Sequence, residues 1–181
     1  MLSVYIRFLA LGLLTQVLAV SAKDYQALKG ESNIFYTLKH PMHLVKGVSN
    51  DFVCTVNLLP DTLHSRITVK VPVASFNSGH SSRDSHTLEV LEALKYPFVE
   101  FVSDSIHSEN QNYRIFGQLT FHGVRRPIDF QVTPLFEKNG IRIKGGFAIK
   151  LTDFKIKPPS LLFIPVEDLL RIDLNVIASR S

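Results

Sequence analysis

The chain has 181 residues, of which 45% are hydrophobic, with 9 glycines and 9 prolines, a composition that excludes a disordered or collagen-like chain. The formal net charge is +4, and the basic residues are dispersed, with Lys150, Lys155 and Lys157 as their densest group. A nucleic-acid-binding protein usually gathers basic and aromatic residues on one stripe, so we expect no nucleic-acid partner.

The first predicted element is a signal peptide over residues 1–22. Arg7 precedes an apolar stretch over residues 8–14, and small residues frame a cleavage point before Lys23. A retained membrane anchor is the alternative, but an anchor needs about 20 mostly apolar residues, and Thr15-Gln16 interrupts this stretch. We therefore expect a periplasmic or secreted protein that does not span the membrane after cleavage.

The remaining residues, 23–181, suit one domain with one hydrophobic core. Without Arg7, this part has 19 Lys and Arg against 16 Asp and Glu, a net charge of +3. Cys54 is the only cysteine of the sequence, so an exported form has no internal disulfide. Residues 52–56 around it alternate like a strand, and we interpret Cys54 as a small buried residue and not as a reactive thiol.

Short segments of alternating apolar and polar residues dominate this domain. Alternation with one wet face is typical of antiparallel sheet. The segments cover residues 34–40, 52–56, 67–73, 99–105, 113–122, 128–132, 141–151 and 170–176. Turn residues separate them, and Asn139-Gly140 is a strong hairpin signal. Gly145-Gly146, inside one segment, predicts a bulge or a bend.

One segment, residues 82–97, has a helical pattern instead. Leu88, Leu91 and Leu94 recur every three residues and form one apolar stripe. Ser and Asp residues at the start can cap a helix, and Pro97 cannot continue it. The sequence therefore predicts one short helix that covers an end or a side of the sheet.

About eight strands and one helix in a domain of this size favour a closed antiparallel β-barrel, with a β-sandwich as the alternative. A barrel of that size holds either packed side chains or one small ligand, and alternation does not distinguish the two. An outer-membrane barrel would turn its apolar residues to the lipid. Because the polar faces here carry Lys, Arg and Asp, we expect a soluble barrel.

Two central motifs resemble the YceI-like family. They are Ser82-Arg83-Asp84-Ser85-His86-Thr87-Leu88 followed by Lys95-Tyr96-Pro97-Phe98-Val99-Glu100-Phe101, and Gly117-Gln118-Leu119-Thr120-Phe121-His122-Gly123-Val124-Arg125-Arg126-Pro127. The segment up to His40 and the Gly146-Phe147 segment with Thr152-Asp153-Phe154 are also similar. The resemblance implies a secreted bacterial, lipocalin-like barrel that binds a polyisoprenoid.

The chain departs from this family pattern at two places. His40-Pro41-Met42-His43 stands where the family has a more open loop. Residues 157–163, Lys157-Pro158-Pro159-Ser160-Leu161-Leu162-Phe163, form an apolar, proline-bearing insertion. The length of the lipid tail therefore does not follow from the resemblance.

The resemblance further implies a ligand along the barrel axis with its polar end at the mouth. We expect the tunnel lining to consist of Tyr36, Leu38, Phe52, Val71, Phe101, Ile115, Leu119, Phe147 and Ile149, with Leu88 and Leu91 of the predicted stripe closing one side. His40, Arg83 and His86 are the candidate head-group ligands. The expected ligand is an isoprenoid lipid or quinone precursor, and no other cofactor is expected.

The histidines give the main alternative. His40, His43, His86 and His122 could form a metal-binding or hydrolytic site, although a metal site needs three or four converging ligands. The sequence has no Gly-x-Ser-x-Gly elbow, so we expect no catalytic residue and no metal. A filled barrel that acts through its outer surface, as a periplasmic interaction or stress protein, is the third alternative, and a homodimer stays open.

Overall fold

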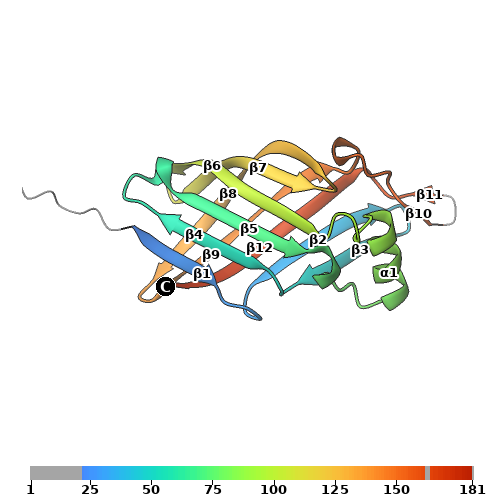
Figure 1. Cartoon of the computed structure of the whole chain (residues 1–181), viewed down its shortest axis with the longest axis horizontal. Coiled ribbons are helices and arrows are strands. Elements are labelled where there is room, and N and C mark those ends of the chain that lie inside the picture. The colour runs from blue at the N-terminus through green and yellow to red at the C-terminus, as the bar shows by residue number, and fades with distance from the viewer. Residues whose placement is uncertain (1–21, 162–163, 181) are drawn as a thin grey trace, which may run out of the picture.

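The computed structural model describes residues 22–161 and 164–180 (Figure 1). Its strands are β1 (Lys23–Ala27), β2 (Asn33–His40), β3 (His43–Ser49), β4 (Val53–Leu58), β5 (Arg66–Pro72), β6 (Phe98–Glu109), β7 (Asn112–Phe121), β8 (Val124–Glu137), β9 (Gly140–Lys150), β10 (Ser160–Leu161), β11 (Ile164–Pro165) and β12 (Leu169–Arg180). Its helices are α1 (Ser81–Val90) and the 3-10 helices η1 (Thr62–His64), η2 (Val73–Ser75) and η3 (Thr152–Phe154). Of the predicted signal peptide, residues 1–21 lie outside the described residues. No helix in the described ranges is long and apolar enough to cross a membrane.

Eight strands form a closed antiparallel barrel in the order β1-β4-β5-β6-β7-β8-β9-β12. β1 closes it, because Tyr25 lies opposite Val56 of β4 on one side and opposite Arg180 of β12 on the other. Every alternating segment of the sequence contributes to one of these strands or to β2. The predicted barrel of about eight strands with one short helix is therefore confirmed, and the sandwich alternative is wrong.

Strand β12 pairs with two different strands along one edge. Its residues near Ala178 pair with β1, whereas its residues from Leu170 to Asn175 pair with β2. β3 pairs with β2 in turn, so the β2–β3 hairpin extends the barrel wall at one end. Figure 1 shows α1 and the β10–β11 hairpin at this same end. We call this end of the barrel the mouth.

The turn between β2 and β3 is tighter than the open loop expected from the family pattern. His40 pairs directly with His43, and Pro41 and Met42 alone form the turn. Strand β3 is absent from the predicted segments because its apolar residues do not alternate cleanly. Leu44 is exposed, and the residues on either side of it are not buried either. The tight turn brings the two histidine rings to 5.0 Å between centroids.

Helix α1 is shorter than the helix predicted over residues 82–97. It ends at Val90 and is followed by a turn in which Glu92 has a left-handed backbone (φ 45°). Leu94 belongs to this turn and is fully exposed, so the predicted stripe of three leucines does not form. The N-cap is His80, whose side chain makes no capping hydrogen bond, and Asp84 instead accepts the N–H of Ser78 at 3.1 Å.

The predicted irregularity at Gly145-Gly146 takes a different form. The register shift lies in β6, between Ser103 and Ser105, and not in β9. At Gly145 the pairing of β8 with β9 ends, and a Cβ there would lie 2.7 Å from the carbonyl oxygen of Gln131. The glycine therefore permits the close approach of β8 at the point where the two strands diverge.

Candidate functional site

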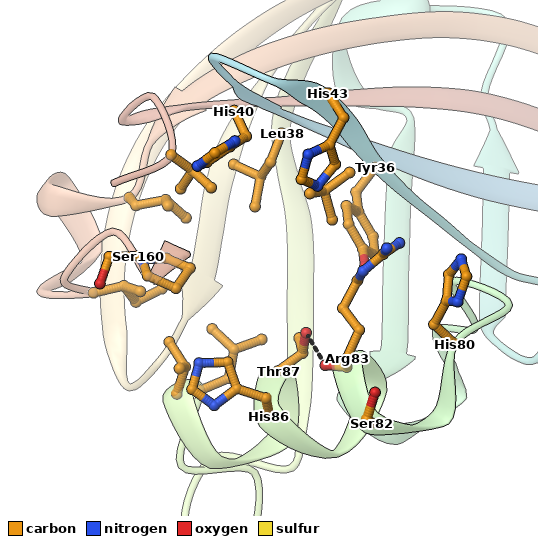
Figure 2. Close-up of a pocket in the computed structure, with 17 residues that line it drawn as sticks. Tyr36, Leu38, His40, His43, His80, Ser82, Arg83, His86, Thr87 and Ser160 are labelled. Carbon is orange, nitrogen blue, oxygen red and sulfur yellow. Dashed lines mark hydrogen bonds between the residues drawn. The ribbon is translucent and has the colours of Figure 1, made fainter. Parts of the chain in front are cut away.

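A cavity of about 410 Å³ opens at the mouth of the barrel (Figure 2). Three parts of the chain form its wall: the β2–β3 hairpin, helix α1, and a third part that consists of residues 151–160 and Val166. The apolar part of the wall consists of Leu38, Val45, Val90, Leu91, Leu151, Ile156, Pro159 and Val166. We call this space the mouth cavity.

The polar part of this wall carries basic groups and hydroxyls. Its members are His40, His43, His80, Arg83, His86, Tyr36, Ser82, Thr87 and Ser160, and no Asp or Glu of the described residues lines the cavity. Arg83 and His86 were expected at the head group, and both come from α1. His43, His80 and Ser160 were not expected there. Ser160 belongs to the apolar insertion of residues 157–163, of which residues 162–163 lie outside the described part.

Helix α1 turns a different face to the cavity from the one predicted. Arg83, Thr87, Val90 and Leu91 line the mouth cavity, a spacing of four, three and one that fits one side of a helix. His86 lies on the same side. Leu88 lies on another face of the helix. It lines neither the mouth cavity nor the second cavity, inside the barrel, that is described below. The prediction followed three leucines, whereas the observed face mixes polar and apolar residues, a pattern that resembles a site more than a core stripe.

His40 contributes its ring to the mouth wall but has no free ring nitrogen. Its side chain is only 2% exposed. The N–H of Met42 donates to Nδ1 at 3.2 Å, so the ring proton lies on Nε2, which donates to the carbonyl oxygen of Ile164 at 3.2 Å. His40 therefore ties β2 to β11. Its predicted role as a head-group ligand stays a prediction, and such a contact would require one of these two hydrogen bonds to break.

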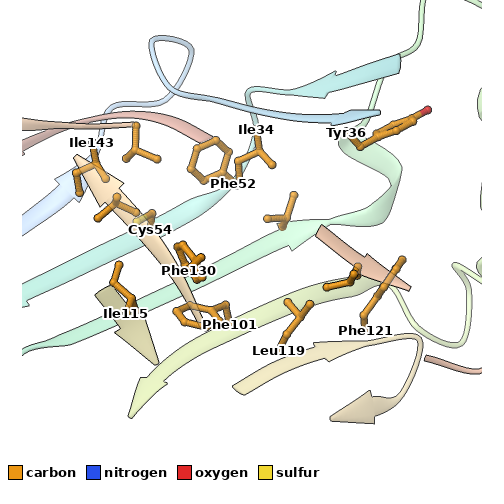
Figure 3. Close-up of a cluster of buried hydrophobic side chains, with 14 of the residues drawn as sticks. Ile34, Tyr36, Phe52, Cys54, Phe101, Ile115, Leu119, Phe121, Phe130 and Ile143 are labelled. Carbon is orange, nitrogen blue, oxygen red and sulfur yellow. The ribbon is translucent and has the colours of Figure 1, made fainter. Parts of the chain in front are cut away.

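A second, smaller cavity of about 130 Å³ lies inside the barrel. We call it the inner cavity. It is lined by Ile34, Tyr36, Val69, Val71, Val73, Phe76, Val99, Phe101, Leu119, Phe121, Phe130, Phe147, Ile149, Leu170, Ile172 and Leu174. Figure 3 shows Phe101, Phe130 and Leu119 gathered in this part of the interior. Phe130 packs against Phe101 at 5.4 Å and against Phe147 at 5.0 Å between ring centroids.

Tyr36 belongs to the walls of both cavities and separates them. Its ring packs edge-on against Phe76 at 5.5 Å between centroids. Burial raises the pKa of the Tyr36 hydroxyl, and the negative charge of Asp84 raises it further, while Arg83 and a hydrogen bond with Thr87 lower it. The hydroxyl therefore stays protonated at neutral pH and provides a neutral polar group between a basic mouth and an apolar interior.

Most of the remaining predicted tunnel residues line one of the two cavities, and two of them line neither. Val71, Phe101, Leu119, Phe147 and Ile149 line the inner cavity, and Leu38 and Leu91 line the mouth cavity. Phe52 is buried in the core but lines neither cavity, and Ile115 faces a separate void of about 30 Å³. Alternation indicates which side chains point inward, but it does not indicate at which height along the barrel axis each one lies.

His122 lies apart from the other histidines of the predicted group. Its Nδ1 donates to the carbonyl oxygen of Phe154 at 3.2 Å, and its Nε2 lies 2.9 Å from a carboxylate oxygen of Glu92. Tyr96 packs against the ring at 4.7 Å between centroids. The four histidines thus do not converge, and the described residues contain no group of three or more His, Cys, Asp or Glu arranged to hold a metal ion.

Comparison with solved structures shows the same fold elsewhere. Burkholderia cenocepacia BcnA matches with a TM-score of 0.78 and 21% identity, over 84% of this chain and 99% of that one. A polyisoprenoid binding domain from Saccharophagus degradans, implicated in plant cell wall breakdown, matches with a TM-score of 0.67 and 13% identity, over 87% and 98%. The YCEI protein of Campylobacter jejuni matches with a TM-score of 0.64 and 22% identity, over 76% and 85%.

Sequence comparison identifies bacterial relatives. A UPF0312 protein of Pseudomonas putida (strain F1) is 36% identical over 106 residues, which are 52% of this chain and 54% of the relative. One of Pseudomonas syringae pv. syringae is 32% identical over 122 residues, 61% of this chain and 60% of the relative. The matches thus span only about half to three fifths of these relatives. The family model of the YceI-like domain matches residues 25–178, nearly the whole barrel, and the chain therefore belongs to the YceI-like family.

Proposed function

We propose that this protein binds an amphiphilic isoprenoid-type lipid or quinone precursor and carries it without converting it. The observation that supports this most is the arrangement of two adjoining cavities, one polar and open, the other apolar and internal, with Tyr36 between them. The polar end of the ligand would occupy the mouth cavity and its chain would point into the barrel. One solved structure with the same fold is a polyisoprenoid binding domain.

The volumes indicate how the ligand would fit. The mouth cavity, at about 410 Å³, is within the range of roughly 300 to 1,000 Å³ that holds small ligands. The inner cavity, at about 130 Å³, is below that range. A long chain therefore needs side chains of the inner cavity to move, with Tyr36 turning aside first.

The hydrophobic effect favours such an entry. Removing a ten-carbon chain from water gives roughly 8 kcal/mol, at about 0.8 kcal/mol for each CH₂ group. Ordering the chain and repacking the aromatic residues offset part of this gain. Aromatic side chains that already border an empty space repack at lower cost than those of a filled core, because no contacts must first be broken on their empty side.

We also propose export to the periplasm or the medium, on the basis of the signal-like composition of residues 1–22. N-terminal sequencing of the protein recovered from a periplasmic fraction tests this. The expected first residue is Lys23, whereas a product that starts at Met1 and remains with the membrane would contradict export.

The experiment that tests the proposed function is native mass spectrometry of protein purified without denaturation from a bacterium that makes isoprenoid lipids. We expect an adduct with the mass of a lipid. Phe147→Arg places a charge in the inner cavity and should abolish the adduct, whereas Ala148→Arg, on the exposed face of the same strand, should retain it. A bare mass, or a metal-sized adduct only, would contradict the proposal and favour one of its two alternatives.

Phe147→Arg could also prevent folding, so a milder variant is needed. Val99→Phe adds apolar volume to the inner cavity at an expected stability cost of about 1–3 kcal/mol. It should fold and lose lipid, because the added ring occupies the space that the chain needs. Unchanged lipid loading in a folded Val99→Phe variant would show that the chain lies elsewhere.

A further inference from the structure

We propose that the protein docks on the surface of an anionic lipid bilayer through exposed apolar residues of the β2–β3 turn and of β11. The inference goes beyond the proposed function, because it concerns the outer surface of the molecule and a partner that is not the carried ligand. It is tested without any ligand in the barrel, so each of the two proposals can fail alone.

The two hairpins at the mouth expose apolar side chains outside the cavity. Met42, in the β2–β3 turn, is 68% exposed, Leu44 of β3 is 53% exposed, and Ile164 of β11 is 41% exposed. Their neighbours Pro41 and Pro165 are exposed as well. None of these five residues lines the mouth cavity. We call them the rim patch.

His40 joins the two halves of the rim patch. Its Nδ1 accepts the N–H of Met42 at 3.2 Å, and its Nε2 donates to the carbonyl oxygen of Ile164 at 3.2 Å, so both residues lie against one buried ring. Beside them, the Lys39 ammonium pairs with Glu167 at 2.6 Å. Figure 1 shows the two hairpins at the same end of the molecule. The rim patch is therefore continuous, and a continuous exposed apolar patch marks an interaction site more than scattered single residues do.

The basic residues around the rim patch favour an anionic partner. Lys155 and Lys157 lie on either side of Ile156, which lines the mouth cavity, and both lysines are exposed. Lys46 of β3 is exposed too, and none of the three lysines makes an ion pair among the described residues. The β2–β3 hairpin, residues 33–49, contains no Asp or Glu. Each lysine near an anionic bilayer surface adds to the attraction.

The size of the rim patch favours a bilayer over a protein partner. A stable protein interface buries about 800 Å² on each partner, formed by roughly 20–30 residues. Five residues at the ends of two hairpins supply much less than that. Binding at a bilayer surface needs only shallow burial of a few apolar side chains together with attraction between basic residues and anionic lipids.

The opposite end of the barrel provides the comparison. Leu135 and Phe136 are 58% and 52% exposed, and they lie close to the β8–β9 turn. Glu137 follows them directly, so an acid accompanies these apolar residues. In the same turn, the carbonyl oxygen of Asn139 accepts the N–H of Arg180, near the C-terminal end of β12 and away from the mouth. An anionic surface therefore favours the mouth end over this one.

Helix α1, on the other side of the mouth cavity, carries acids on its surface. Asp84 and Glu89 belong to the helix, and Glu92 follows it. We therefore expect the hairpin side of the mouth to meet the bilayer and α1 to stay in water. Ser85, an exposed residue of α1, provides a position from which to test this orientation.

The experiment uses the fact that the sequence contains no tryptophan. A single introduced Trp then reports the surroundings of one position in the whole protein. We expect the emission of Met42→Trp to shift to the blue, and to be quenched by brominated lipids, when vesicles of phosphatidylethanolamine and phosphatidylglycerol are added. The matched variants Leu135→Trp and Ser85→Trp should keep their emission, because both positions should stay in water.

Cosedimentation of the wild type with the same vesicles measures binding without an introduced Trp. Lys155→Gln combined with Lys157→Gln should lower the partition coefficient by about fivefold for each lysine, the effect of one basic residue near an anionic surface. The control pair Lys138→Gln and Lys144→Gln removes the same charge from exposed positions at the β8–β9 turn and on β9, and should change it less than twofold. High salt should weaken the binding, because it screens exposed charges.

Four outcomes would overturn the proposal. The wild type might fail to sediment with the anionic vesicles, or bind vesicles of phosphatidylcholine equally well. The blue shift might occur in Leu135→Trp and not in Met42→Trp. A dimer that Met42→Asp dissociates, without vesicle binding, would assign the rim patch to a second copy of the chain. A lipid adduct in the native mass spectrum would stand in each case, since it tests the barrel interior.

Discussion

The phenol ring of Tyr36 covers the α-carbon of Gly47, its cross-strand partner in the β2–β3 hairpin. A Cβ at position 47 would overlap the ring and would lie 2.9 Å from its hydroxyl oxygen. Glycine at this position therefore allows Tyr36 to lie against the hairpin, between the mouth cavity and the inner cavity. The position of the side chain that separates the two cavities thus depends on the absence of a side chain opposite it.

Gly47→Ala should displace the Tyr36 ring and destabilise the protein by about 1–3 kcal/mol, the usual range for an overpacked site. The same substitution should cost much less in a Tyr36→Ala background, because the overlapping ring is then absent. Urea denaturation of the four proteins of this double-mutant cycle measures the coupling. Additive effects of the two substitutions would show that the ring does not depend on Gly47.

His40→Ala should destabilise the fold without abolishing lipid binding. The substitution removes two hydrogen bonds, one from the Met42 N–H and one to the Ile164 carbonyl, and each contributes about 0.5–1.5 kcal/mol. Arg83→Gln, at a site with no ion pair among the described residues, should change stability by less than about 0.5 kcal/mol. Denaturant unfolding compares the two, and equal losses of stability would contradict the separate roles assigned to them.

Cys54 makes stability depend on pH in the alkaline range. Burial raises the pKa of its thiol to about 12, from 9.0 for an exposed thiol. Since the folded state holds this proton more tightly than the unfolded state, the thiol's contribution to stability is complete below pH 9 and is lost as the pH rises toward 12. The loss is at most about 1.4 kcal/mol per pH unit.

The measurement for Cys54 is the free energy of unfolding of wild type and Cys54→Ala between pH 8 and pH 11. The wild type should lose stability more steeply, and the difference in slope isolates the thiol from the Lys and Tyr residues that titrate in the same range. At pH 8 a thiol reagent should label Cys54 only when denaturant unfolds the protein. Rapid labelling without denaturant would show that the thiol is accessible and the predicted burial wrong.

The fold followed from the sequence because alternation with a period of two is a strong and local signal. In β7, Ile115, Gly117, Leu119 and Phe121 all point inward and all are buried. Strand β3 was not predicted, because its sequence does not alternate between apolar and polar residues. Its apolar Leu44 is exposed, and at the buried position 47 it has a glycine in place of an apolar side chain. Its place in the fold follows from pairing with β2, a long-range relationship that a local pattern does not contain.

The candidate site followed from the sequence only in part. Arg83 and His86 lie in the mouth wall, where the family motif led us to expect them, but His40 uses both ring nitrogens on backbone groups, one of the neighbouring Met42 and one of the distant Ile164. Ile164, one of those partners, is 124 residues away in the chain, and no spacing in the sequence indicates that contact. The helix face was misjudged for a related reason, because only the position of α1 against the β2–β3 hairpin selects which of its sides faces the cavity.

The central claim, that a lipid chain occupies the barrel interior, is tested most directly by locating the chain itself. Intermolecular NOEs between a bound isoprenoid and the methyl groups of methyl-labelled protein report this location. We predict NOEs from the distal end of the chain to Leu119 and Ile149 of the inner cavity, and none to the exposed Leu135. NOEs confined to Leu135 or other exposed methyl groups, with Leu119 and Ile149 silent, would contradict the account.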